Sequence, residues 1–231
     1  ARMREFALAM RAIWNTWLTG EKLEFRGEFY QHTLMTPMFS PDKRELDGFG
    51  PPKMFLAGVG PLMTEVAGEA FDGFICHGFT TEKYLREVTI PALKLGREKA
   101  GKTMEGFEIV GPSFVVTGNN DQEIEQAAAA TRKQIAFYGS TPAYRPVLDM
   151  HGWGGLQDEL NKLSKQGEWD KMGTLIDDEI LDTFAVVGEP EDIACELGSR
   201  YGDVIQRLSF YAPYASNPDR WAKVMSDLKA A

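Results

Sequence analysis

A glycine-rich segment between an apolar run and a helical pattern is the part of the sequence best suited to chemistry. Residues 54–57 read Met-Phe-Leu-Ala and predict a strand, and Gly58-Val59-Gly60 then leads through Pro61 into a helical pattern. Glycine lets the backbone approach a ligand closely, and proline suits the first turn of a helix. The amides and positive dipole end of that helix attract anions. The segment predicts a phosphate cradle, although a merely tight turn would give the same pattern.

A second strand-like run, residues 74–76, ends in Cys76 and His77. Its alternation with the preceding helical pattern predicts a βαβ unit, which requires parallel strands. A histidine at a strand end is typical of a ligand-binding position, but a solvated or capping histidine fits the same place. Cys76 is typical of an inert packed thiol, because a buried cysteine behaves as a small hydrophobic residue.

Composition excludes several classes of protein. The 231 residues carry a formal net charge of −9, 43% hydrophobic and 26% charged residues, as a soluble globular protein does. A nucleic-acid partner is not expected, because phosphate backbones need clustered Lys and Arg. No apolar run approaches the roughly 18 residues of a membrane span. Two distant cysteines and three scattered histidines predict neither a disulfide framework nor a metal site. We expect a cytoplasmic protein.

Strand and helix patterns alternate along the chain. Strands are predicted at residues 53–57, 72–77, 107–117 and 204–211, with helices over 2–18, 61–70, 82–100 and 218–230. About 85 residues between the third and fourth strands are almost all helical in pattern. They include a helix opened by Asn120 and Glu123 and another, residues 190–201, opened by Pro190. The pattern predicts an α/β fold with a parallel sheet, in a single domain over residues 1–231.

Three segments carry a resemblance to a known family. At residues 25–30 (FRGEFY), 51–61 (PPKMFLAGVGP) and 67–78 (AGEAFDGFICHG), the sequence resembles the bacterial luciferase-like superfamily, in particular its deazaflavin-dependent oxidoreductases. The resemblance implies a TIM barrel with its cofactor at the C-terminal face of the strands. By the order of motifs, the chain is similar to the C-terminal half only, strands five to eight, with a long helical insertion before the last strand.

The resemblance also implies positions for the ligands. Ala57, Gly58, Val59 and Gly60 match the loop under the phosphate-bearing tail of the cofactor, and Cys76 and His77 match side chains beside that tail. A polar-aromatic cluster lies in the insertion, which in this family covers the mouth of the active site, and it is a candidate for substrate contact or for helix core. Its members are Tyr144, Arg145, His151 and Trp153. Catalytic residues are expected in the family's first four strands, which this sequence lacks.

The implied function is hydride transfer between a deazaflavin, coenzyme F-420, and a small organic substrate. Two alternatives stay open: an FMN-dependent monooxygenase of the same superfamily, and a catalytically silent half-barrel fragment. Four strands of an eight-stranded barrel would leave edges at residues 53–57 and 204–211 and expose apolar side chains such as Phe55, Ile75 and Phe210. We therefore expect a homo-oligomer, or completion by a missing N-terminal half.

Overall fold

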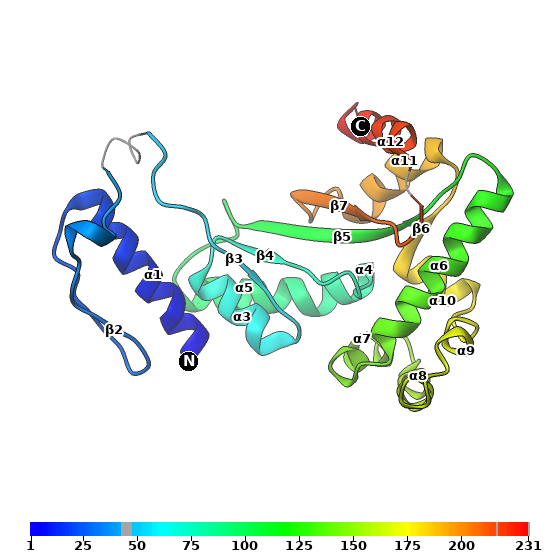
Figure 1. The fold of residues 1–231 in the computed structure, drawn as a ribbon, viewed down its shortest axis with the longest axis horizontal. Helices are drawn as coiled ribbons and strands as arrows, with labels where there is room; N and C mark the ends of the chain where they lie inside the picture. The colour runs from blue at the N-terminus through cyan, green and yellow to red at the C-terminus, as the bar shows by residue number, and fades with distance from the viewer. Residues whose placement is uncertain (43–47, 216, 231) are drawn as a thin grey trace. The chain divides into compact units, whose positions relative to one another are not determined.

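The computed structural model describes residues 1–42, 48–215 and 217–230. The chain divides into two compact units, whose elements are labelled in Figure 1. Unit 1 holds the described residues up to Leu56, together with Pro61–Phe74 and Ala92–Phe107. Unit 2 holds Ala57–Gly60, Ile75–Pro91 and the residues from Glu108 on. The single domain expected from the sequence stays a prediction.

Unit 1 is built on helices that meet at glycines. It contains α1 (Arg2–Thr19), α3 (Pro61–Ala70), most of α5 (Ile90–Lys99), and the hairpin of β1 (Phe25–Arg26) and β2 (Gln31–His32). A Cβ atom added at Gly68 of α3 would lie 2.2 Å from the carbonyl oxygen of Leu93 in α5, and one at Gly96 would lie 2.0 Å from that of Glu65. These two glycines therefore allow the helix backbones to touch.

Carboxylates of unit 1 hold its loops and strand ends. Glu5 of α1 accepts hydrogen bonds from three successive backbone N–H groups in the hairpin, residues 28–30. Asp72, just before β4 (Gly73–Ile75), accepts the N–H of Met54 at 2.8 Å and a hydrogen bond from the guanidinium of Arg11 at 2.9 Å. Asp72 thus fixes the approach to β3 (Phe55–Ala57) and to β4.

The sheet of unit 2 is organised around β5 (Glu108–Val116), the longest strand. Among the strands that pair with it, β6 (Ala185–Val187) and β7 (Arg207–Tyr211) are parallel to it. Phe114 is in register with both Ala185 and Tyr211, so β6 and β7 lie at opposite edges of β5. The end of β4 joins β5 where the Cys76 N–H donates to the carbonyl of Val110 at 2.8 Å, and β3 follows β4 in the strand order.

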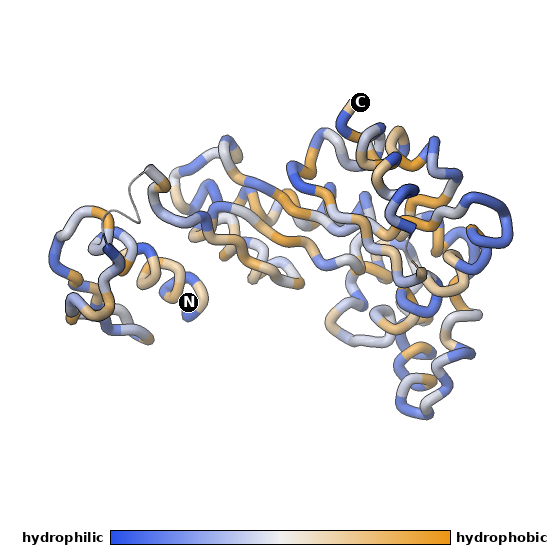
Figure 2. The backbone as a smooth tube through the Cα atoms, turned by 45° about the horizontal axis from the view of Figure 1, so that its top comes forward, coloured by the Kyte–Doolittle hydropathy of each residue, from blue (hydrophilic) through white to orange (hydrophobic). Residues whose placement is uncertain are grey.

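Two groups of helices follow β5 in the chain. One group, between β5 and β6, consists of α6 (Asp121–Gly139), α7 (Arg145–Asp149), α8 (Gly154–Gln166), α9 (Trp169–Gly173) and α10 (Asp178–Phe184). Its apolar side chains form the main core with Phe114 and Val116 of β5. After β6 come α11 (Pro190–Tyr201) and α12 (Pro218–Ala230). Figure 2 shows hydrophobic residues along the strands and hydrophilic residues on the outer helical turns.

A buried arginine anchors α12 to the turn after β5. The side chain of Arg220 is 6% exposed. It donates to the carbonyl of Thr117 at 3.2 Å and to the side chain of Asn119 at 3.3 Å, and it pairs with Glu123 at the start of α6. Tyr214 adds a hydrogen bond from its hydroxyl to the carbonyl of Val115 at 2.8 Å. The carboxyl end of β5 is therefore fixed from several sides.

Two expectations from the sequence need correction. The predicted helical insertion is interrupted by β6. β6 follows α10 with no residue between them, so the sequence shows no break at which a new strand could be recognised. Phe210 also points away from the side on which we expected it, because its ring stacks on Trp221 of α12 at 5.0 Å. The four predicted strands and the helices over residues 61–70, 190–201 and 218–230 are confirmed, the strands with shorter bounds.

Among the described residues, no helix has the length and apolar character needed to cross a bilayer. The same residues contain no group of three or more His, Cys, Asp and Glu side chains arranged to hold a metal ion.

Candidate functional site

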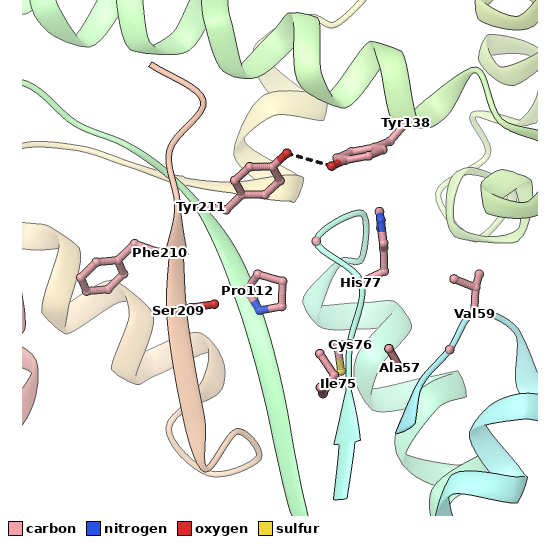
Figure 3. A pocket seen from close by; sticks show the side chains of 12 residues that line it. Ala57, Val59, Ile75, Cys76, His77, Pro112, Tyr138, Ser209, Phe210 and Tyr211 are labelled. Atoms are coloured by element: carbon pink, nitrogen blue, oxygen red, sulfur yellow. Dashed lines mark hydrogen bonds between the residues drawn. The ribbon is translucent and has the colours of Figure 1, made fainter. Parts of the chain in front are cut away.

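An open pocket of about 560 Å³ lies in unit 2 where β3, β4 and β7 end (Figure 3). Its walls come from the loop after β3, the turn after β4, the middle of β5, one residue of α6 and the end of β7. The lining residues are Ala57, Gly58, Val59, Ile75, Cys76, His77, Gly78, Pro112, Tyr138, Ser209, Phe210 and Tyr211. Carboxyl ends of parallel strands are where ligands bind in α/β proteins.

The loop after β3 contributes small residues to this pocket. Ala57 ends the strand and Pro61 opens α3, so the turn occupies only Gly58, Val59 and Gly60. Gly60 has a φ of +82°, which favours glycine, and an added Cβ would meet nothing within 4 Å. Ala57, Gly58 and Val59 line the pocket, and Gly60 does not. The turn is therefore tight, and it also borders open space, so both interpretations of the sequence pattern remain compatible with it.

His77 is held in one tautomer by the backbone. Its Nδ1 accepts a hydrogen bond from the N–H of Phe79 at 3.0 Å. Nδ1 must therefore lack a proton, and a neutral ring then carries its proton on Nε2. Burial lowers the pKa of His77 below its ordinary value of 6.5, which also favours the neutral ring. Tyr144 stacks on the ring at a centroid distance of 4.6 Å, and Tyr138 meets it edge-on at 4.7 Å.

Cys76 lines the pocket as a protonated thiol. Burial raises its pKa to about 12, so at neutral pH the thiolate needed for nucleophilic attack is negligible. Its backbone N–H is used in pairing with β5. The interpretation of this cysteine as inert packing is consistent with both observations.

Two tyrosines complete the polar part of the pocket. The hydroxyl groups of Tyr138, near the end of α6, and Tyr211, at the end of β7, lie 2.8 Å apart (Figure 3). The ring of Tyr211 stacks on Phe114 at 4.7 Å. Burial, followed by the hydrogen bond to Tyr138, raises the pKa of Tyr211 to about 12. Tyr211 is thus uncharged at neutral pH.

The candidate residues of the insertion are not all brought to this pocket. Tyr144 reaches it indirectly, through its stacking on His77. Arg145 instead pairs with Asp158 at 2.7 Å and Asp149 at 3.5 Å. His151 lies 2.9 Å from the hydroxyl of Thr81, which caps α4 (Glu82–Tyr84), and its ring stacks on Trp153 at 4.8 Å. Substrate contact by these four residues stays a prediction.

The sequence did not single out the tyrosine pair. Tyr211 ends the last predicted strand, and its position at a strand end was a usable signal. Tyr138 had no such signal in the sequence, because the face that a long helix turns toward a sheet depends on how the whole insertion packs.

A profile of the luciferase-like monooxygenase family matches residues 1–206. The chain belongs to this family. An uncharacterized protein of Mycobacterium tuberculosis is 51% identical over 207 residues, which cover 90% of this chain and 60% of that protein. The F420-dependent glucose-6-phosphate dehydrogenase of Gordonia bronchialis is 35% identical over 108 residues, 47% of this chain and 29% of that protein.

A solved structure shows the same fold. The coenzyme F420-dependent tetrahydromethanopterin reductase from Methanopyrus kandleri superposes with a TM-score of 0.71 at 15% identity, covering 95% of this chain and 61% of that one. The α/β luciferase-like fold with its parallel sheet, expected from the sequence, is confirmed. The chain spans 60% of the length of the mycobacterial relative.

Proposed function

We propose that the chain is part of an oxidoreductase that transfers a hydride between the deazaflavin coenzyme F420 and a small organic substrate. The carrying observation is the pocket at the strand ends, in which the glycine turn, His77 and the tyrosine pair face one space. Family membership and the F420-dependent relative support the choice of cofactor.

The residues present fit such a cofactor. Ala57, Gly58 and Val59 would lie against its phosphate-bearing tail, where small side chains leave the backbone accessible. Gly60 shapes the turn through its positive φ. Cys76 and His77 would flank the tail from the end of β4. The cofactor supplies the hydride chemistry when bound, while the protein binds it and excludes competing reactions.

The architecture proposed for the whole protein is a TIM barrel. In this arrangement β3, β4, β5 and β7 are strands five to eight, and β6 is an addition within the insertion. The side of the sheet that carries Ile75 and Ser209 would face the barrel interior. Ile75 is 38% exposed, and Val59 at the rim is 41% exposed. We propose that either a second copy of the chain or an N-terminal half covers this side.

A second candidate function is an FMN-dependent monooxygenase, favoured by the family's name. A third, from another class, is a catalytically silent fragment, favoured by the 60% coverage of the mycobacterial relative. A phosphate site at the turn after β3 would not distinguish F420 from FMN, because both cofactors carry phosphate.

The experiment that tests the cofactor site replaces Gly58 with valine. Gly58 is not among the glycines with positive φ, so its backbone does not require glycine for that reason. We expect Gly58→Val to weaken F420 binding at least tenfold with little change in the urea midpoint. Gly155→Val, outside the pocket and with open space around its Cβ, serves as control and should bind F420 as the parent does. An equal loss of stability and binding would favour a merely tight turn.

A further inference from the structure

The fold holds the hydroxyl groups of Tyr138 and Tyr211 together at the wall of the pocket. Tyr138 belongs to α6 and Tyr211 to β7, and the two residues are 73 positions apart in the sequence. Their hydroxyl oxygens nevertheless lie 2.8 Å from each other. Phe114 supports one ring by stacking, and the edge-on contact with His77 supports the other. Ring packing thus fixes both hydroxyl groups before any ligand arrives.

The hydrogen bond between the two tyrosines can run in either direction. Each phenol is both a donor and an acceptor, and the 2.8 Å contact allows either oxygen to donate. The hydroxyl that accepts within the pair keeps its own proton for a third oxygen. The hydroxyl that donates keeps lone pairs to accept from one. The pair can therefore donate to a ligand or accept from it without any change of charge.

The described residues that line the pocket carry no formal charge. Among the described residues that line the pocket there is no Lys, Arg, Asp or Glu. His77 is neutral, because its Nδ1 is already an acceptor for Phe79. An anionic group beside the tyrosine hydroxyls would be removed from water without a cation to compensate it, and without the backbone amides that a phosphate would meet at the turn after β3, which is unfavourable. An uncharged oxygen has no such cost.

We propose that the Tyr138–Tyr211 pair binds the uncharged oxygen of an alcohol or carbonyl substrate, which rests on the proposed function. Oxidation of an alcohol by F420 would move a hydride from carbon to the deazaflavin and release the hydroxyl proton to water, leaving a carbonyl. The substrate oxygen therefore changes from donor and acceptor to acceptor only. A tyrosine pair that reverses its own hydrogen bond can donate to either form and can also accept from the alcohol, whereas Lys or Arg can only donate and a carboxylate can only accept.

The test measures ligand binding without cofactor, so that it is independent of the proposed redox function. Cyclohexanol, cyclohexanone and cyclohexanecarboxylate are titrated into the ¹⁵N-labelled protein, and NMR shifts of pocket residues report the dissociation constants. We expect the alcohol and the ketone to bind, and the carboxylate to bind at least tenfold more weakly. Tyr138→Phe and Tyr211→Phe should each weaken binding of the alcohol and the ketone about fivefold, the effect of losing one uncharged hydrogen bond.

The double variant adds a second, independent readout. Because the two hydroxyls act as one unit, Tyr138→Phe combined with Tyr211→Phe should lose less than the product of the single effects. Tyr30→Phe, whose hydroxyl contacts Arg2 in unit 1, is the matched control and should bind as the parent does. Equal binding of the carboxylate, unchanged binding by both single variants, or no binding of any probe would overturn the proposal. A parent protein that binds the alcohol and the ketone but not F420 would instead count against the proposed function alone.

Discussion

The Nδ1 atom of His77 accepts the backbone N–H of Phe79 at 3.0 Å. A hydrogen bond between residues two positions apart in the turn after β4 thereby decides which nitrogen of the ring carries the proton. Because the acceptor nitrogen is occupied, a second proton on the ring would break this bond. The chemistry that His77 offers to the pocket is that of a neutral donor.

This relationship predicts the titration of His77. The pKa should lie below 6.5, since burial disfavours the charged ring. The unfolded chain takes up a proton first as pH falls below about 6.5, so this residue's contribution to stability is present above that pH and is lost on acidification. ¹⁵N NMR should show the Nε2–H tautomer at pH 7. An Nδ1–H tautomer, or a pKa at or above 6.5, would contradict the assignment.

The buried arginine of α12 predicts a large loss of stability on replacement. Arg220→Met removes the guanidinium that contacts Glu123 and the carbonyl of Thr117, and among the described residues it leaves the Glu123 carboxylate only the N–H of Asn119. We expect a loss of about 2 kcal/mol in the free energy of unfolding, because Glu123 remains partly exposed. Urea denaturation measures it.

Lys223→Met is the matched control for that variant. Lys223 lies on the same helix and pairs with Asp227 at the surface. Its replacement should leave the urea midpoint unchanged within error. Similar losses for the two variants would show that Arg220 does not anchor α12 as the structure indicates.

Two helical glycines have different surroundings, one crowded and one open, which predicts opposite effects of alanine at the two positions. Gly68→Ala places a Cβ 2.2 Å from the carbonyl oxygen of Leu93 and should cost about 1–3 kcal/mol. Gly198→Ala, within α11, meets nothing within 4 Å and should stabilise the protein by about 0.5–1 kcal/mol, the usual helical advantage of alanine. Thermal unfolding compares them, and a stabilising Gly68→Ala would refute the close helix contact.

Helix ends were the most predictable part of the fold. Asn120 accepts the N–H of Glu123 at 3.0 Å, as the capping pattern predicts, and Pro190 opens α11 where proline at the first turn predicts a helix. These signals are local, since each depends on residues within one turn. β6 was not predictable, because its three residues become a strand only through pairing with residues 114–116 of β5.

Some residues of the candidate site could likewise be predicted from the sequence, and others depend on tertiary packing. Strand-end positions such as Ala57 and His77 follow from element order alone, and the structure places both in one pocket. The partner of His77 does not follow from sequence, because Tyr144 reaches it through the packing of the insertion. Arg145 and His151 looked equally suitable by type. Their nearby partners, Asp158 and Thr81, engage them instead.

The uncovered side of the sheet predicts association. Exposure of side chains such as Ile75 at about 25 cal/mol per Å² of apolar surface costs several kcal/mol over the whole face. We expect light scattering to show that the 231-residue chain is not a monodisperse monomer. A stable, soluble species of 25.8 kDa would refute this expectation.

The most direct test of the proposed function is a comparison of the two cofactors on the parent protein. Equilibrium dialysis against equal concentrations of F420 and FMN, followed by absorption spectra of the retained protein, measures which one binds. We predict saturable binding of F420 near one molecule per site, reduced by Gly58→Val, with FMN bound at least tenfold more weakly. Preferential binding of FMN would favour the monooxygenase, and binding of neither would contradict the cofactor site altogether.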